Sequence, residues 1–132
     1  MIRRVFLAVL IVGVTACGGD GTGLENVAGL YTLQTIDGAP LPWILLEVGA
    51  NKIEVTAGSV TLNTDRTCSD SITLATTESG NVDSDTATDV CTYTTDGQAI
   101  TLTYTDNSIS VGTIIGSALT ITDAGVAFIF RK

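Results

Sequence analysis

The sequence predicts an all-β domain: a small antiparallel up-and-down barrel of about eight or nine short strands, with a β-sandwich as the alternative. Three observations lead to this expectation. Thr, Val and Ile dominate the chain after residue 26, turn-forming residues recur at short intervals, and no window has helical periodicity. Because the chain contains no helical crossover, consecutive strands are expected to pair antiparallel.

Turn residues set the limits of each expected strand. The strands are expected at residues 29–36, 43–48, 52–63, 67–76, 85–94, 98–105, 108–115, 118–122 and 126–131. The turns Asp37-Gly38, Asp96-Gly97 and Ala124-Gly125 accept the positive φ of tight hairpins. Pro40 and Pro42 exclude their connection from the centre of a sheet, and Gly58 predicts a bulge in the third strand.

Alternating residues indicate which side chains point inward. Ile100, Leu102 and Tyr104 alternate with threonines, so these three are expected inside the barrel and the threonines outside. Eight inward apolar positions are candidates for lining a ligand: Leu33, Ile53, Val55, Leu62, Ile72, Leu74, Ile100 and Leu102. A barrel of this size either holds one small ligand or is filled by its own side chains, and the sequence leaves both open.

The N-terminus has the pattern of a secretory signal. Arg3 and Arg4 precede an apolar stretch at residues 5–14, which is too short for a membrane span of about 20 residues. Small residues follow, and then Cys17. We therefore expect residues 1–16 to be a signal peptide.

The segment Val14-Thr15-Ala16-Cys17 resembles the lipobox of bacterial lipoproteins. The resemblance implies cleavage before Cys17, diacylglycerol on its sulfur, an acyl chain such as palmitate on its amino group and, because Gly18 is not Asp, the outer membrane. The alternative is a secreted protein cleaved near Ala16. Residues 17–26 are glycine-rich and predict a flexible tether, with the barrel domain at residues 27–132.

The remaining cysteines are expected to form a structural disulfide. The chain has three cysteines, so lipid on Cys17 leaves Cys68 and Cys91 as a pair in an oxidising compartment. The alternative, a redox-active pair, requires close spacing and an activating neighbour.

Both ends of the domain resemble the lipocalin-like barrels. In that family a Gly-x-Trp on the first strand lies beside an Arg from the last strand at one end of an up-and-down barrel. Gly29-Leu30-Tyr31 and Arg131 stand at those places, with Tyr31 replacing the Trp. The resemblance implies a barrel-end pair of Tyr31 and Arg131; otherwise these are ordinary strand-end residues. No C-terminal helix is expected, which departs from the family pattern.

Composition excludes several function classes. The formal net charge is −8, and removal of residues 1–16 takes away Arg3 and Arg4, so the chain has no basic face for nucleic acid or anionic lipid. The chain contains no His, which removes the commonest general base and metal ligand. We therefore expect no catalytic residues, no cofactor and no enzymatic activity.

One acidic cluster is a weak candidate for calcium: Asp70, Asp83, Asp85 and Asp89. If Ser79-Gly80 is a hairpin tip, Cys68 lies opposite Cys91 and Asp70 lies opposite Asp89. Like charges at opposed positions are destabilising. The hairpin is therefore splayed or bulged there, or it holds a cation such as Ca²⁺. The alternative is a solvated acidic loop without a metal.

These observations together predict a monomeric, lipid-anchored envelope protein without catalytic activity. The favoured hypothesis is that it binds a small apolar ligand in or at the mouth of the barrel. The alternative is a structural or interaction lipoprotein with a filled barrel and a protein partner. The sequence does not distinguish a periplasmic from a surface-facing position.

The anchor assignment predicts that Cys17→Ser releases the protein from membranes, because no acyl chain then holds it in the bilayer. Fractionation after a high-salt wash measures this. A Cys17→Ser protein that stays in the membrane fraction would show that the anchor is wrongly assigned.

Overall fold

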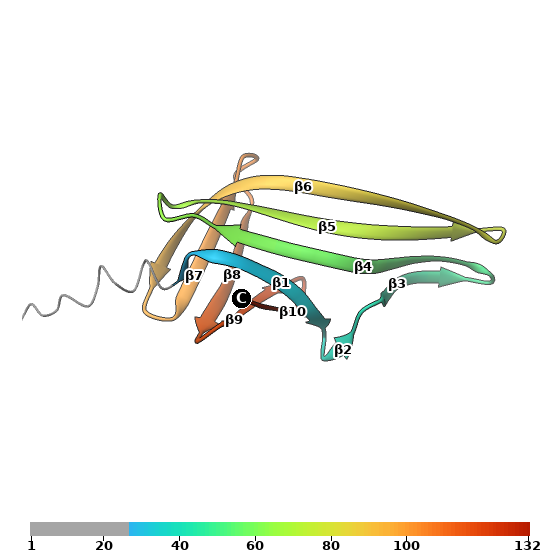
Figure 1. Ribbon diagram of the computed structural model, residues 1–132, viewed down its shortest axis with the longest axis horizontal. Coiled ribbons are helices and arrows are strands. Elements are labelled where there is room, and N and C mark those ends of the chain that lie inside the picture. Colours follow the sequence, from blue (N-terminus) through green and yellow to red (C-terminus); the bar gives the residue numbers. More distant parts are fainter. Residues whose placement is uncertain (1–26) are drawn as a thin grey trace, which may run out of the picture.

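The computed structural model describes residues 27–132, which form strands joined by short connections (Figure 1). The strands are β1 (Gly29–Ile36), β2 (Ala39–Pro40), β3 (Trp43–Val48), β4 (Asn51–Leu62), β5 (Thr67–Glu78), β6 (Asn81–Asp96), β7 (Ala99–Tyr104), β8 (Ile109–Ile115), β9 (Ala118–Asp123) and β10 (Val126–Arg131). The signal peptide expected at residues 1–16 and the tether at 17–26, with Cys17, lie outside the described residues.

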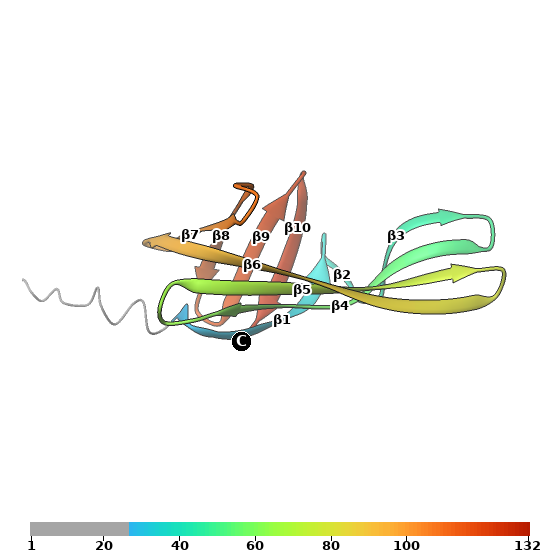
Figure 2. The ribbon, with the colours of Figure 1, turned by 90° about the horizontal axis from the view of Figure 1, so that it is seen from above.

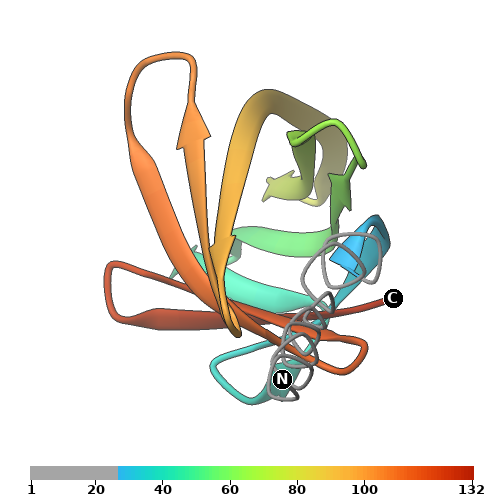
Figure 3. The same ribbon diagram turned by 90° about the vertical axis from the view of Figure 1, so that its left-hand side faces the viewer.

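The sheet closes into a barrel (Figure 3). All strands belong to one antiparallel sheet in the order β2-β1-β10-β9-β8-β7-β6-β5-β4-β3, and an additional β1–β4 pairing joins eight of them in a ring. The first part of β1 pairs with β4, where Leu30 lies opposite Thr61. Its second part pairs with β10, where Ile36 lies opposite Phe128. The predicted antiparallel barrel, with its last strand paired to its first, is therefore confirmed.

Tight turns set the register of the hairpins. Both central residues have positive φ at Asp37-Gly38, Ser79-Gly80 and Ala124-Gly125, as two-residue hairpins between twisted strands require. The Ser79-Gly80 turn lets β6 begin at Asn81, earlier than the expected residue 85. Sequence analysis also missed β2, where Pro40 lies on an edge strand that pairs with β1.

Inward-pointing side chains form the core of the barrel, which is packed at the end where β1 begins. The largest fully buried ones are Tyr31, Ile36, Val60, Leu62, Tyr93, Ile100, Leu102 and Leu119. Each such side chain contributes roughly 1.5–3 kcal/mol relative to exposure to water. Two tyrosine hydroxyls close this end: Tyr31 Oη donates to the Val27 carbonyl at 2.6 Å, and Tyr93 Oη donates to the Asn63 carbonyl at 2.5 Å. We call this the closed end.

The bulge predicted in this strand lies just before Gly58, and Gly58 itself has a packing role. The register shift in the β4–β5 pair falls between Val55 and Ala57, just before Gly58. A Cβ atom at Gly58 would lie 2.9 Å from Leu33 Cδ2 and 3.0 Å from Ile72 Cδ1. Glycine is therefore required because side chains from other strands cross directly over its Cα atom.

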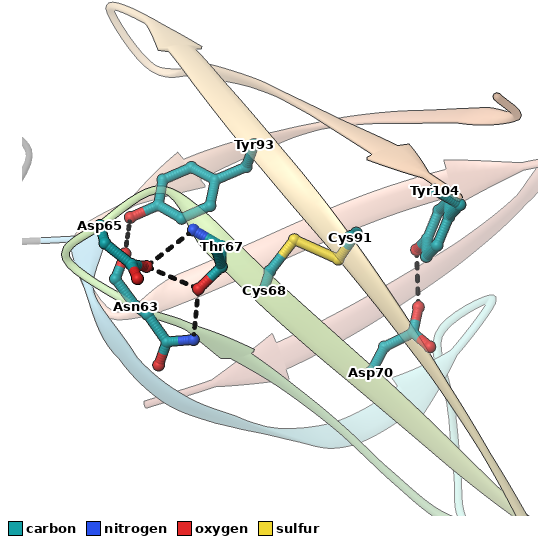
Figure 4. The surroundings of a disulfide bond; sticks show 8 residues. All are labelled: Asn63, Asp65, Thr67, Cys68, Asp70, Cys91, Tyr93 and Tyr104. Carbon is teal, nitrogen blue, oxygen red and sulfur yellow. Dashed lines mark hydrogen bonds between the residues drawn. A yellow bond between two sulfur atoms is a disulfide. The ribbon is translucent and has the colours of Figure 1, made fainter. Parts of the chain in front are cut away.

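A disulfide joins two of the strands that extend beyond the barrel. Cys68 on β5 lies opposite Cys91 on β6, and their Cα atoms are 4.8 Å apart (Figure 4). The predicted bridge between these residues is confirmed. Its sequence separation is 23 residues, and a loop of that size stabilises the fold by roughly 3 kcal/mol in the chain-entropy model.

Three strands continue beyond the barrel as a long, twisted extension (Figure 2). β4 pairs with β1 only over residues 59–62, and β6 pairs with β7 only over residues 91–96. Residues 51–55 of β4, 74–78 of β5 and 81–85 of β6 therefore pair with one another and with β3. This four-stranded unit, including β3, is named the arm.

Candidate ligand site at the barrel mouth

The end of the barrel opposite the closed end is hollow, and we call it the mouth. An inner cavity of about 130 Å³ has apolar walls formed by Ile72, Ile121, Phe128 and Phe130. It adjoins a wider hollow of about 560 Å³ that opens between the β7–β8 turn and the start of the arm. Tyr104, Asp70, Ser110 and Asp123 line both spaces. The mouth therefore combines an aromatic and aliphatic floor with a polar rim.

A tyrosine–carboxylate hydrogen bond crosses the junction of these two spaces. Tyr104 ends β7, and its hydroxyl donates to Asp70 Oδ2 on β5 at 2.6 Å (Figure 4). Alternation along β7 directs Tyr104 to the same side as Ile100 and Leu102, as expected from the sequence. The bond satisfies two half-buried polar groups that would otherwise lose their water partners.

Burial and a neighbouring acid disturb the titration of this pair. Burial raises the pKa of Asp70, the hydrogen bond from Tyr104 lowers it, and the charge of Asp89 raises it again, with a net increase. Burial also raises the pKa of Tyr104, and the carboxylate of Asp70 adds to that increase. Tyr104 therefore stays a neutral donor at neutral pH.

The rim of the mouth is acidic. Asp89, Asp106 and Asp123 line the wider hollow together with Asp70, and no Lys or Arg is among its lining residues. Asp106 is held ionised by its own turn, because the Ser108 hydroxyl and backbone N–H donate to its Oδ1 and lower its pKa. The mouth therefore favours neutral or cationic groups over anions.

The predicted ligand-lining residues separate into three groups. Ile72 lines the inner cavity. Leu33, Leu62, Ile100 and Leu102 are buried in the core. The other three lie on the arm: Ile53, Val55 and Leu74, of which Val55 is buried in the core and Leu74 packs against it. Of the eight, Ile72 alone is among the residues that line the two mouth spaces.

Several mouth residues were missed from the sequence. Ile121, Phe128 and Phe130 form the apolar walls, and Asp123 contributes to the rim. Alternation in the last two strands, with Phe128 and Phe130 on one side, was the available signal. It shows that these side chains point inward, but the position of the cavity along the barrel depends on packing.

The acidic cluster proposed for calcium is divided between the mouth and the arm. Asp70 lies opposite Asp89 as predicted, and the β5–β6 register is continuous, so the hairpin is neither splayed nor bulged. Tyr104 instead donates to Asp70. Asp83 and Asp85 lie farther out on β6. Within residues 27–132, no three acidic, Cys or His side chains are grouped closely enough to hold a metal.

The barrel-end pair has a different cation from the expected one. Lys132 Nζ lies 5.5 Å from the centroid of the Tyr31 ring. Arg131 lies opposite Thr32, and its side chain is exposed. Because Tyr31 and Phe130 point into the barrel, alternation places Arg131 on the outer face. The aromatic–cation pair therefore lies at the predicted end of the barrel, with Lys132 in place of Arg131.

Comparison of the chain with family models, with curated proteins and with solved structures finds no match. Among the described residues, no helix has the length and apolar character needed to span a membrane.

The Asp70 environment predicts an effect on stability that depends on pH. Folding raises the Asp70 pKa, so the free energy of unfolding contributed by this group falls as pH rises from about 3.9 through the raised value. Asp70→Asn keeps an oxygen that can accept from Tyr104 but removes the charge. At neutral pH it should stabilise the protein by on the order of 0.5–1 kcal/mol, because it removes a like-charge pair.

Urea unfolding at a series of pH values measures this effect. Asp85→Asn is the matched control, because Asp85 lies opposite Leu74 and not opposite an acid. The stability gain of Asp70→Asn over the wild type should increase with pH, and that of Asp85→Asn should change little. Equal pH profiles for the two variants would contradict the assignment.

Proposed function

We propose that the protein is a lipid-anchored, non-catalytic envelope protein of lipocalin-like type that binds one small, mainly apolar ligand at the barrel mouth. The observation that carries the proposal is the inner cavity bounded by Phe128, Phe130, Ile121 and Ile72, with Tyr104 and Asp70 at its entrance. Small-molecule sites commonly combine an apolar cavity with a few polar groups that fix orientation.

The two spaces suggest where the apolar and polar parts of such a ligand would lie. The inner cavity, about 130 Å³, is similar to an engineered cavity of roughly 150 Å³ that accepts benzene. The outer hollow, about 560 Å³, is within the range of roughly 300–1,000 Å³ typical of ligand pockets. A ring or short branched chain would occupy the inner cavity, and a neutral or cationic polar group would face Asp70 and the rim.

The proposed lipid anchor is consistent with a mouth that a ligand reaches from outside the bilayer. Val27, the first described residue, lies at the closed end, where its carbonyl accepts a hydrogen bond from the Tyr31 hydroxyl. A lipid on Cys17 would therefore attach through the closed end, on the side of the barrel opposite the mouth. The outer-membrane location itself rests on Gly18 following Cys17.

The alternative function is a structural or interaction protein with a filled barrel and a protein partner. The packed closed end favours it, since Tyr31, Leu62 and Tyr93 leave no space there. The two candidates differ in whether the mouth takes up a small molecule.

Titration with Nile red, a neutral apolar dye, tests the ligand site through its fluorescence increase. Ser110→Phe should fill the mouth, because Ser110 lines both spaces. Thr113→Phe on the same strand is the control, because Thr113 lies on the outer side of β8 and is exposed. We expect Ser110→Phe to weaken dye binding at least tenfold and Thr113→Phe to leave it unchanged.

Two outcomes would reject the mouth as the ligand site. One is equal dye binding by the two variants, which would place the dye elsewhere on the protein. The other is no dye binding by the wild type together with no co-purifying small molecule in native mass spectrometry. The second outcome would favour the filled barrel.

A further inference from the structure

One face of the arm is apolar and lies on the same side of the sheet as the barrel interior. Directly opposed residues of antiparallel strands share a face. Trp43, Val55 and Leu74 form one row across β3, β4 and β5, and Leu46, Ile53 and Thr76 form the next row outward. The first row has the same orientation as Ile72, which points into the mouth.

Toward the tip of the arm this face is open, whereas nearer the barrel Val55 is 5% exposed and Trp43 and Leu74 pack against the core. Leu46 is 55% exposed and Val48 is 67% exposed. A shallow hollow of about 150 Å³ lies over this part of the arm, between Leu46, Ile53 and Thr76. A soluble protein rarely leaves a contiguous apolar area open unless another molecule binds there.

The border of the face is acidic. Asp85 lies opposite Leu74 and Asp83 lies opposite Thr76, so both carboxylates are on the apolar face, along the outer strand β6. The only basic residue of the arm is Lys52, which lies opposite Glu47 on the other face. Its Nζ is 3.6 Å from Glu54 Oε2. Lys52 borders the hollow over this face and is paired with Glu54, so Asp83 and Asp85 give the β6 side of the face its negative charge.

This charge distribution determines what kind of partner fits. A second copy would bring the same acidic border, and its other basic residues in the described part, Arg66, Arg131 and Lys132, lie at the closed end. The apolar side chains occupy the β3–β4 side of the face and the acids occupy the β6 side. A partner with adjacent apolar and basic stripes would match both halves.

We propose that the arm docks a basic amphipathic helix of another protein. Five residues of strand extend for about 17 Å, the length of roughly three helical turns. Apolar side chains of the helix would contact Leu46, Val48 and Ile53, while its Lys or Arg side chains would face Asp83 and Asp85. This surface is separate from the mouth and does not depend on a small ligand there.

The test uses a synthetic amphipathic helix of Leu and Lys as the probe and the same helix with Glu in place of Lys as the charge control. Binding to the purified protein is measured by calorimetry, and its location by backbone NMR shifts. The Leu/Lys helix should shift resonances of β3, β4 and β5 in the arm, and the Leu/Glu helix should not bind.

Two pairs of variants separate docking from non-specific adhesion. Leu46→Thr removes an apolar contact, and Ile44→Thr is its control on the other face of β3, where Ile44 lies opposite Glu54. Asp83→Asn with Asp85→Asn removes the acidic border, and Glu47→Gln is the control on the other face. The Leu46 variant and the double Asp variant should each weaken binding at least fivefold, and the two controls should change it less than twofold.

Other results would overturn the proposal. These are no binding of the Leu/Lys helix, equal weakening by a variant and its control, or shifts confined to the mouth. Self-association of the wild type that Leu46→Thr abolishes would instead identify a second copy as the occupant.

Discussion

Pairing of β1 with two different strands is the constraint on which the rest of the fold depends. Its first part bonds to β4 and its second part to β10, so a single strand removes two open edges of the ring. Closure converts one face of the sheet into an interior where Tyr31 and Leu62 are withheld from water. Closure also limits the barrel to the part of β4 from residue 59 onward. The earlier part of β4, and the segments of β5 and β6 beside it, therefore extend outward as the arm.

The long β5–β6 pair divides the molecule into a packed half and an open half. The pair of Cys68 and Cys91 lies in the packed half. The next pair along these strands whose side chains point inward, Asp70 and Asp89, lies at the mouth. A carboxylate at that position is hard to bury, and Tyr104 stabilises its charge with one hydrogen bond. The packed apolar core therefore ends at this acidic pair. The mouth, and the arm beyond it, hold the surfaces on which the two functional proposals rest.

Local chemistry made much of the fold predictable from the sequence. Turn residues set the limits of most strands, and the expected strands at 43–48 and 126–131 match β3 and β10. A hairpin tip at Ser79-Gly80 predicted that Cys68 lies opposite Cys91 and Asp70 opposite Asp89, as observed. These features depend on period-two alternation and turn geometry, which short segments encode.

Features that depend on packing between distant segments were not predictable in the same way. Alternation assigned Ile53, Val55 and Leu74 to the inner face correctly, but only closure decides whether that face lies inside the barrel or on the arm. Gly58 correctly suggested a bulge in β4, but its packing against Leu33 and Ile72 depends on other strands. The cation beside Tyr31 is Lys132. The side chain of Arg131 points outward, and this orientation follows from the position of β10 in the ring.

Native-state hydrogen exchange of backbone amides tests the closed barrel and its separate arm most directly. Amides of β1 that bond to β4 and β10 should exchange only through global unfolding. Amides joining β3 to β4 should exchange faster, through opening of the arm alone. If the β1 amides exchange as fast as those of β3, the ring is open in solution, and the account of core, mouth and arm built on its closure is wrong.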